Sequence, residues 1–333
     1  MHNTILDAAF LTTVLAATIR VATPILFTAL GEALAESAGI LNIAVEGMMA
    51  LGAFSGLVVA FWTDNSWIGF GGALLTGATA GLLFGIITIE CGADHVVTGI
   101  VMNLFCFGAV SLAYQSLFAN ASDVPQIEAM QPVATVSWLL QTTSFGKIFL
   151  SHSPIVYVGF GLVPIFWLVL YRSTWGLQVR AVGENPSAAE SAGINVWRVR
   201  FIAIGIGGAM AAVGGATLSI GQIGGYLDNI TGGRGFIALA VVVFGSWNPV
   251  RVGGAALLFG AAEALELRLQ SAGNFIPHEI LLAFPYVLTI IVVAVFAGSA
   301  RYPAAVNSYY PRPKGWLVTR LKMGRGNCES PVH

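Results

Sequence analysis

The sequence predicts an all-α polytopic integral membrane protein, a bundle of about eight to ten transmembrane helices. Three observations lead to this fold class. The 333 residues are 56% hydrophobic and only 9% charged, a composition outside the range of ordinary soluble domains. Apolar runs of about 20 residues, the length that crosses a hydrocarbon core of about 30 Å, recur along the chain. The 40 glycines suit helices that approach each other closely in lipid.

The apolar runs define the predicted spans. In chain order they cover 5–30, 40–62, 67–90, 95–118, 153–171, 201–221, 235–246, 252–267 and 280–298. A polar break at 31–39 separates the first two runs. Taken singly the runs give nine crossings, with the N-terminus outside. If Arg20 and Pro24 divide the first run, the count is ten and the N-terminus is inside.

Charge orients these spans. All but two of the 15 basic residues lie from Arg172 onward, and cytoplasmic loops are the ones enriched in Lys and Arg. The loop 172–200 and the basic tail 301–333 are therefore predicted to be cytoplasmic, and 119–152 extracytoplasmic. Residues 1–300 form one transmembrane domain in this scheme.

The apolar runs after the 172–200 loop must be divided to give a consistent topology. Loop and tail lie on the same side only if an even number of crossings separates them. A division at Trp247-Asn248-Pro249 gives that number. Because 235–246 is then short for a span, we expect a broken or partly re-entrant helix, which is tolerated where it is buried in protein.

The cytoplasmic loop carries helix signals of its own. Asn185 suits an N-cap, Pro186 the first helical position and Gly193 a left-handed C-cap, which predicts a short helix over 186–192. A helix of this length does not persist alone in water. It must therefore pack on its own bundle or dock on another protein, for which Ala188, Ala189 and Ala192 would form a small apolar face.

A hexapeptide occurs twice. Ala-Glu-Ser-Ala-Gly-Ile covers 35–40 and 189–194. The match is either chance in an alanine- and glycine-rich chain or a trace of the internal duplication found in transporters.

Several polar residues interrupt apolar runs. Asn42 and Glu46 are four apart, on one face of a helix expected to begin near Ile40, and Asn103 needs a partner if buried. We expect these three, with Trp247 and Asn248, to line a substrate pathway. Alternatively, Glu46 bonds backbone amides at the Gly39 break.

We expect structural roles for two further charged residues. Asp94 is expected to cap the helix that follows it. Arg234 is expected to reach toward the membrane interface, as long basic side chains commonly do.

Known catalytic and nucleotide-binding motifs are absent. The sequence contains no Gly-x-x-x-x-Gly-Lys-[Ser/Thr] and no His-Glu-x-x-His, and its three cysteines have no paired spacing. We therefore expect no ATP hydrolysis by this chain, no cofactor, no metal and no nucleic-acid partner. Carboxylates within spans keep an ion-coupled secondary transporter open as an alternative.

Three long motifs resemble one family. The runs Glu36–Phe54, Val179–Asn195 and Gly233–Pro249, the last continued at Leu257–Glu263, are similar to ABC-importer permeases of the nucleoside and simple-sugar class. Ala44 stands where that family commonly has glycine.

The resemblance implies a type II ABC-importer-like permease bundle in the bacterial inner membrane. The implied partners are a second, homologous permease, ATPase subunits that bind ATP and Mg²⁺, and a periplasmic or lipoprotein substrate-binding protein. The implied activity is alternating-access import of nucleosides or related sugars and purines. ATPase coupling would fall to Arg180, Gly183, Glu184, Asn185, Pro186, Ala188, Ala189, Ala192 and Gly193.

Overall fold

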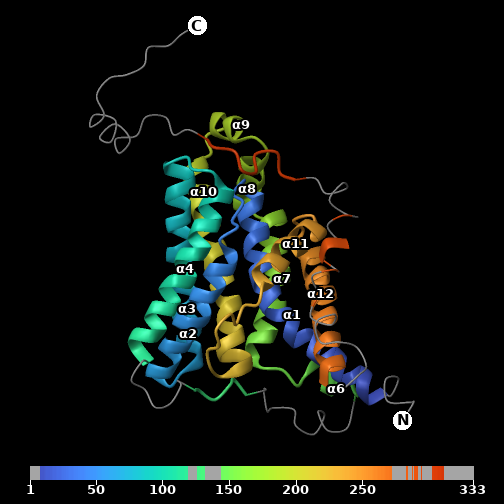
Figure 1. Cartoon of the computed structure of the whole chain (residues 1–333). Helices are drawn as coiled ribbons and strands as arrows, with labels where there is room; N and C mark the ends of the chain where they lie inside the picture. Colours follow the sequence, from blue (N-terminus) through green and yellow to red (C-terminus); the bar gives the residue numbers. More distant parts are fainter. Residues whose placement is uncertain are drawn as a thin grey trace.

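The computed structural model describes residues 8–118, 126–131, 144–271 and 302–310, together with residues 283, 287, 289–291 and 294. Its secondary structure is helical, and no strand occurs in these ranges (Figure 1). The helices are α1 (Ala8–Ser37), α2 (Val45–Thr63), α3 (Ser66–Gly85), α4 (His95–Phe118), α6 (Ser144–Phe149), α7 (Pro154–Arg172), α8 (Thr174–Glu184), α9 (Pro186–Ser191), α10 (Val196–Ala216), α11 (Arg234–Gly245) and α12 (Pro249–Ser271). Two of them continue as π-helical turns, α3 through η1 (Ile86–Glu90) and α10 through η3 (Thr217–Ile223).

The fold class predicted from the sequence is confirmed. Six helices of the described part are long and apolar enough to cross a membrane: Phe10–Ser37, Val45–Thr63, Ser66–Glu90, His95–Phe118, Pro154–Arg172 and Val196–Ile223. Helix α12 has 23 residues, or about 35 Å at 1.5 Å per residue. The predicted run at 280–298 lies mostly outside the described residues.

Helix α1 differs from its prediction in two ways. It runs without interruption through Arg20 and Pro24, so the divided first span is wrong. It also continues to Ser37, so most of the predicted polar break at 31–39 is helical. The actual break, which we call the corner, covers 38–44.

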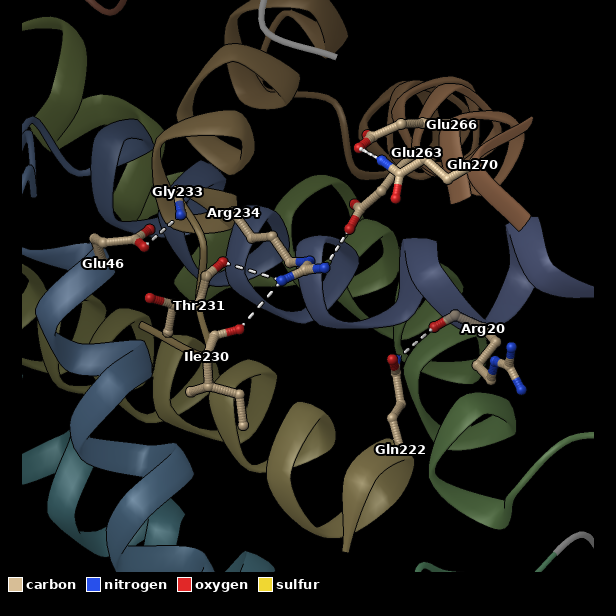
Figure 2. Close-up of polar contacts among 10 residues, drawn as sticks. All are labelled: Arg20, Glu46, Gln222, Ile230, Thr231, Gly233, Arg234, Glu263, Glu266 and Gln270. Carbon is tan, nitrogen blue, oxygen red and sulfur yellow. Dashed lines mark hydrogen bonds and ion pairs between the residues drawn. The ribbon is translucent and has the colours of Figure 1, made fainter. Parts of the chain in front are cut away.

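A side chain from another helix explains how α1 tolerates its proline. Pro24 has no N–H to donate to the carbonyl of Arg20, four residues earlier. The Gln222 side-chain amide donates to that carbonyl at 3.0 Å (Figure 2). The acceptor that proline leaves unpaired is thus satisfied within the bundle.

Helix α10 forms the centre of the bundle and contacts α1, α2 and α3. Its approach to α3 is very close, because a Cβ atom on Gly208 would lie 2.4 Å from the carbonyl oxygen of Gly77. Glycine is required there, in line with the packing of small residues in membrane bundles.

The two ends of the bundle differ. Helices α8 and α9 lie at one end, together with the residues 302–310, whereas α6 and the start of α1 lie at the other (Figure 1). We call the first the α9 end. The corner also belongs to it, since a Cβ atom on Gly183 of α8 would lie 2.1 Å from the Ser37 carbonyl oxygen.

Candidate functional site

Helix α11 is the unusual element of the bundle. Its 12 residues extend about 18 Å, well short of the ~30 Å hydrocarbon core. It begins beside the first turn of α2, where Glu46 binds it, and ends toward the α9 end (Figure 1). The expected short helix at 235–246, separated from the next one at Trp247-Asn248-Pro249, is therefore present.

The carboxylate of Glu46 binds the start of α11. Its Oε1 accepts from the Gly233 amide at 2.8 Å (Figure 2). Its Oε2 accepts from the Gly235 amide at 2.6 Å. The first amides of a helix have no partner within the helix and carry partial positive charge. A carboxylate is thus well placed, and Glu46 is only 3% exposed. The alternative that Glu46 bonds amides at Gly39 is wrong, because its partners lie on α11.

Arg234 links the same helix start to α12. Its guanidinium forms an ion pair with Glu263 and also donates to the carbonyls of Ile230 and Thr231, at 3.2 and 3.3 Å (Figure 2). The expectation that Arg234 reaches the membrane interface is wrong, since its charge is paired within the bundle. This pairing reduces the cost of holding two charged groups away from water.

A second glutamate binds the other end of α11. Glu36 Oε2 accepts from the Trp247 indole Nε1 at 2.5 Å. Ser246 and Trp247 have φ values of 49° and 57°, a left-handed conformation that is unfavourable for residues other than glycine. The surroundings must therefore hold this turn in place.

Neighbouring groups support the turn. The Tyr302 ring packs edge-on against Trp247 with centroids 4.7 Å apart. Asn248 Oδ1 accepts from the Val250 amide at 3.0 Å, which caps the start of α12. The α11–α12 turn is thus fixed by an indole hydrogen bond, a ring contact and a helix cap.

Asn42 and Asn103 both hold the corner. Asn42 donates to Glu32 Oε1 at 2.7 Å and accepts from the Ala44 amide at 3.1 Å. Since α2 begins only at Val45, Asn42 and Glu46 do not share a helix face, and that expectation is wrong.

Asn103 of α4 completes the N-terminal cap of α2. Its Oδ1 accepts from the Gly47 amide at 2.7 Å, and its Nδ2 donates to the Ile43 carbonyl at 2.9 Å. The five residues predicted for the pathway are therefore gathered around α11 and the corner. Each forms hydrogen bonds there with backbone groups or with buried side chains.

Sequence reasoning missed the buried acids Glu32, Glu36 and Glu263. The first two fall in the predicted polar break at 31–39, although their spacing of four on an alanine-rich stretch also fits one face of a helix. Glu263 lies within the predicted 252–267 run, and its partner Arg234 precedes it by 29 residues. A search for intramembrane acids with distant basic partners would have identified this pair.

The loop between α7 and α10 has the predicted helix signals. Asn185 Oδ1 accepts from the Ala188 amide at 3.1 Å, Pro186 is the first residue of α9, and Gly193 has φ 83°. Helix α9 ends at Ser191, one residue before the predicted end of the 186–192 helix.

The exposed face of α9 is smaller than expected. Ala188 and Ala192 are exposed, but Ala189 is 4% exposed and packs into the core. Ala189 therefore cannot belong to a docking face with the other two alanines.

Helix α8 carries the remaining loop residues. The Arg180 guanidinium lies over the Tyr171 ring, 4.9 Å from its centroid, and Glu184 is exposed. Gly183 contacts the end of α1, as noted above.

Asp94 caps α4 as expected. Its Oδ1 accepts from the Val97 amide at 3.0 Å and the Val96 amide at 2.9 Å. The hydrogen bond from Val97 is the main reason that the pKa of Asp94 lies below its ordinary value.

No metal site is indicated in the part of the chain that the structure describes, since its His, Cys, Asp and Glu residues form no group of three that could hold an ion. The bundle, with its six helices long and apolar enough to cross a membrane in the described part, is that of a multi-pass membrane protein.

Comparison with known proteins identifies the family. Residues 14–293 match the family described as branched-chain amino acid transport system / permease component, and the chain belongs to it. It is 32% identical to the guanosine ABC transporter permease protein NupQ of Bacillus subtilis, over 91% of this chain and 98% of the relative. It is 33% identical to the nucleoside ABC transporter permease protein NupC of Lactococcus lactis subsp. cremoris, over 88% and 94%.

Two further comparisons bear on substrate and assembly. TsgC13 of Haloferax volcanii, named provisionally as a glucose ABC transporter permease, is 34% identical over 84% of this chain and 89% of the relative. The Bacillus and Lactococcus species above each have a second, more distant permease that also matches, at 28% and 24% identity. No solved structure matches.

Proposed function

We propose that this chain is one of two different permease subunits of an ABC importer that moves nucleosides into a bacterial cell. The observation that carries the proposal is its similarity, along nearly the whole chain, to permeases named for guanosine and for nucleosides. The occurrence of a second related permease in the same organisms supports a heterodimer. Its other partners would be ATPase subunits that bind ATP and Mg²⁺, and a periplasmic or lipoprotein substrate-binding protein.

The α9 end would face the cytoplasm of the inner membrane. The arginines of the 172–200 loop lie there, in keeping with the enrichment of basic residues in cytoplasmic loops. Helix α9 offers an exposed surface that includes Ala188 and Ala192, and we assign the docking of an ATPase subunit to it. The chain itself would bind no ATP, because it has no phosphate-binding motif.

Contacts at the α9 end suggest how docking could act on the membrane part. Helix α8 precedes α9 and packs through Gly183 against Ser37 at the end of α1. The corner that follows Ser37 leads directly to Glu46, which binds the start of α11. A shift of α8 and α9 would therefore move the corner, and α11 with it, and so change access to the substrate pathway.

We place the substrate pathway along α11. Irregular backbone at membrane depth occurs where it is buried or lines a cavity. The start of α11 is bound by the Glu46 carboxylate of α2, and its Arg234 pairs with Glu263 of α12. Asn42, Asn103, Trp247 and Asn248 would then support the pathway by holding the corner and the α11–α12 turn.

The alternative of ion-coupled transport without an ATPase is motivated by the buried acids. It predicts uptake by this chain alone, driven by an ion gradient. The decisive experiment co-expresses the chain with its candidate partners, purifies it in detergent and reconstitutes it in vesicles. We expect an ATPase to co-purify and tritiated guanosine to be taken up only when ATP is present on the ATPase side.

Two outcomes of that experiment would contradict the proposal. Uptake without ATP would favour the ion-coupled alternative. ATP-driven uptake of tritiated glucose, with none of guanosine, would keep the importer but change its substrate class.

A further inference from the structure

The segment 302–310 follows the last predicted span and returns to the α9 end (Figure 1). We propose that this tail segment, which connects α9 to the corner and to the α11–α12 turn, contains two positioning residues for transport, Tyr302 and Tyr310. ATPase docking at α9 would then reach α11 through the tail as well as through α8. The inference rests on the proposed function, in which an ATPase docks at α9.

One end of the tail segment binds α9 and α10. The Tyr310 hydroxyl donates to Glu190 of α9, and its ring packs against Trp197 of α10 with centroids 5.3 Å apart. Two places before Tyr310, the Ser308 carbonyl accepts from Arg200 Nη1 at 3.1 Å. The C-terminal part of the segment is thus attached directly to the docking helix and its neighbour.

The middle of the segment binds α8 directly, and Arg200 links the segment to the corner. The Ala305 amide donates to the Gly183 carbonyl at 2.8 Å. Arg200, only 2% exposed, donates through Nε to the Ala38 carbonyl at 3.3 Å while its Nη1 binds the tail. One buried guanidinium therefore joins the tail segment to the corner.

The other end of the segment reaches the α11–α12 turn. Tyr302 packs on Trp247, the residue whose indole binds Glu36. Because Ser246 and Trp247 hold a disfavoured left-handed conformation, the turn depends on groups that press on it. Tyr302 is one of them, so movement of the tail segment would change a contact that keeps the turn in place.

The two copies of the repeated hexapeptide make similar contacts in this arrangement. The glutamate of each copy accepts a hydrogen bond from an aromatic side chain, Glu36 from Trp247 and Glu190 from Tyr310. The tail segment supplies the second aromatic donor and packs on the first. It therefore spans the distance between the two copies, one at the end of α1 and the other at the docking helix.

The test uses the complete reconstituted importer and the variants Tyr310→Phe and Tyr302→Leu. Tyr309→Phe is the matched control, because Tyr309 is 54% exposed and its ring lies against Gly92. The readout is the number of ATP molecules hydrolysed per molecule of tritiated guanosine taken up. A purely structural role would change the yield of complex but not this ratio.

We expect both variants to co-purify with the ATPase in wild-type amounts and to raise the ratio by roughly threefold to tenfold, the scale of one lost intramolecular hydrogen bond for Tyr310→Phe and of one lost aromatic ring contact for Tyr302→Leu. Tyr309→Phe should leave the ratio unchanged. A wild-type ratio in Tyr310→Phe would overturn the inference. Loss of ATPase co-purification in that variant would also overturn it, since Tyr310 would then serve docking itself. Failure of wild-type protein to bind any ATPase would instead refute the proposed function.

Discussion

The two copies of Ala-Glu-Ser-Ala-Gly-Ile form the same local structure in opposite surroundings. Each ends a helix with a left-handed glycine, Gly39 at φ 88° and Gly193 at φ 83°. In each, the isoleucine amide donates to the carbonyl of the first alanine, at 3.1 Å for Ile40 and 3.0 Å for Ile194. This is the six-to-one bond of the Schellman motif. The first copy is buried inside the bundle, whereas half of the second, Ser191–Gly193, is exposed at the end of α9.

The comparison separates what six residues determine from what the fold determines. The helix ending follows from the local sequence, because glycine alone accepts the left-handed position without strain. Burial and partners differ because α1 is surrounded by α10, α11 and α12 while α9 lies at an end of the bundle (Figure 1). A shared helix ending is thus explained by the hexapeptide alone and does not require a duplicated domain.

The largest difference in stability between the two copies is expected when their glutamates are replaced by alanine. Glu36→Ala leaves the buried Trp247 indole N–H without its acceptor, a loss that typically costs about 1–3 kcal/mol. Glu190→Ala removes the half-buried hydrogen bond from Tyr310 and should cost about 0.5–1.5 kcal/mol. The midpoint of thermal unfolding in detergent measures both. Glu36→Gln is the control, since its amide oxygen can still accept from the indole, and equal shifts for the two alanine variants would contradict the difference in surroundings.

Replacement of the two left-handed glycines by alanine tests whether the packing around them differs between the copies. Both variants force a Cβ atom into the left-handed region, which costs about 1–2 kcal/mol. At Gly39 the new atom would also lie 3.0 Å from the Ala305 carbonyl oxygen and from Arg200 Nη2, whereas at Gly193 nothing lies within 4 Å. We therefore expect the larger fall in unfolding midpoint for Gly39→Ala. A larger fall for Gly193→Ala would show that the left-handed strain, and not the packing, differs between the copies.

A mild effect on stability is expected from the loss of a helix cap near the exposed copy. Asn185 caps α9 and Asn195 caps α10, whose first-turn amides they bind at 3.1 and 3.0 Å. Either alanine variant should cost about 1 kcal/mol. Only Asn185→Ala should reduce ATPase co-purification, because α9 is too short to persist without its cap and contacts. Equal co-purification of the two variants would mean that the order of α9 is unimportant for docking.

Local signals in the sequence were sufficient for part of the fold. The caps of α9, the break at Trp247-Asn248-Pro249 and the short length of α11 all depend on neighbouring residues. Long apolar runs gave the membrane-spanning class for the same reason. Each of these features depends on residues within a few turns of one another.

The corner could not be placed from local signals. Glu32 and Glu36 suggest a polar break until their partners are known, and the Trp247 that binds Glu36 lies 211 residues away. The same holds for Pro24, which α1 tolerates because Gln222 binds the free carbonyl, and for Glu46, whose partners lie 187 and 189 residues further on. The inward orientation of Ala189 likewise depends on where α9 packs.

The most direct test of the account is guanosine uptake by the reconstituted importer carrying Glu46→Leu, with Glu46→Gln beside it. The central claim is that Glu46 holds the start of α11 in the transport pathway. Leucine removes both amide hydrogen bonds to a charged acceptor, so uptake should fall by about tenfold or more, whereas glutamine keeps one oxygen and should give an intermediate rate. ATPase co-purification should stay at the wild-type level in both, because α9 is untouched. Wild-type uptake by an assembled Glu46→Leu complex would contradict the claim.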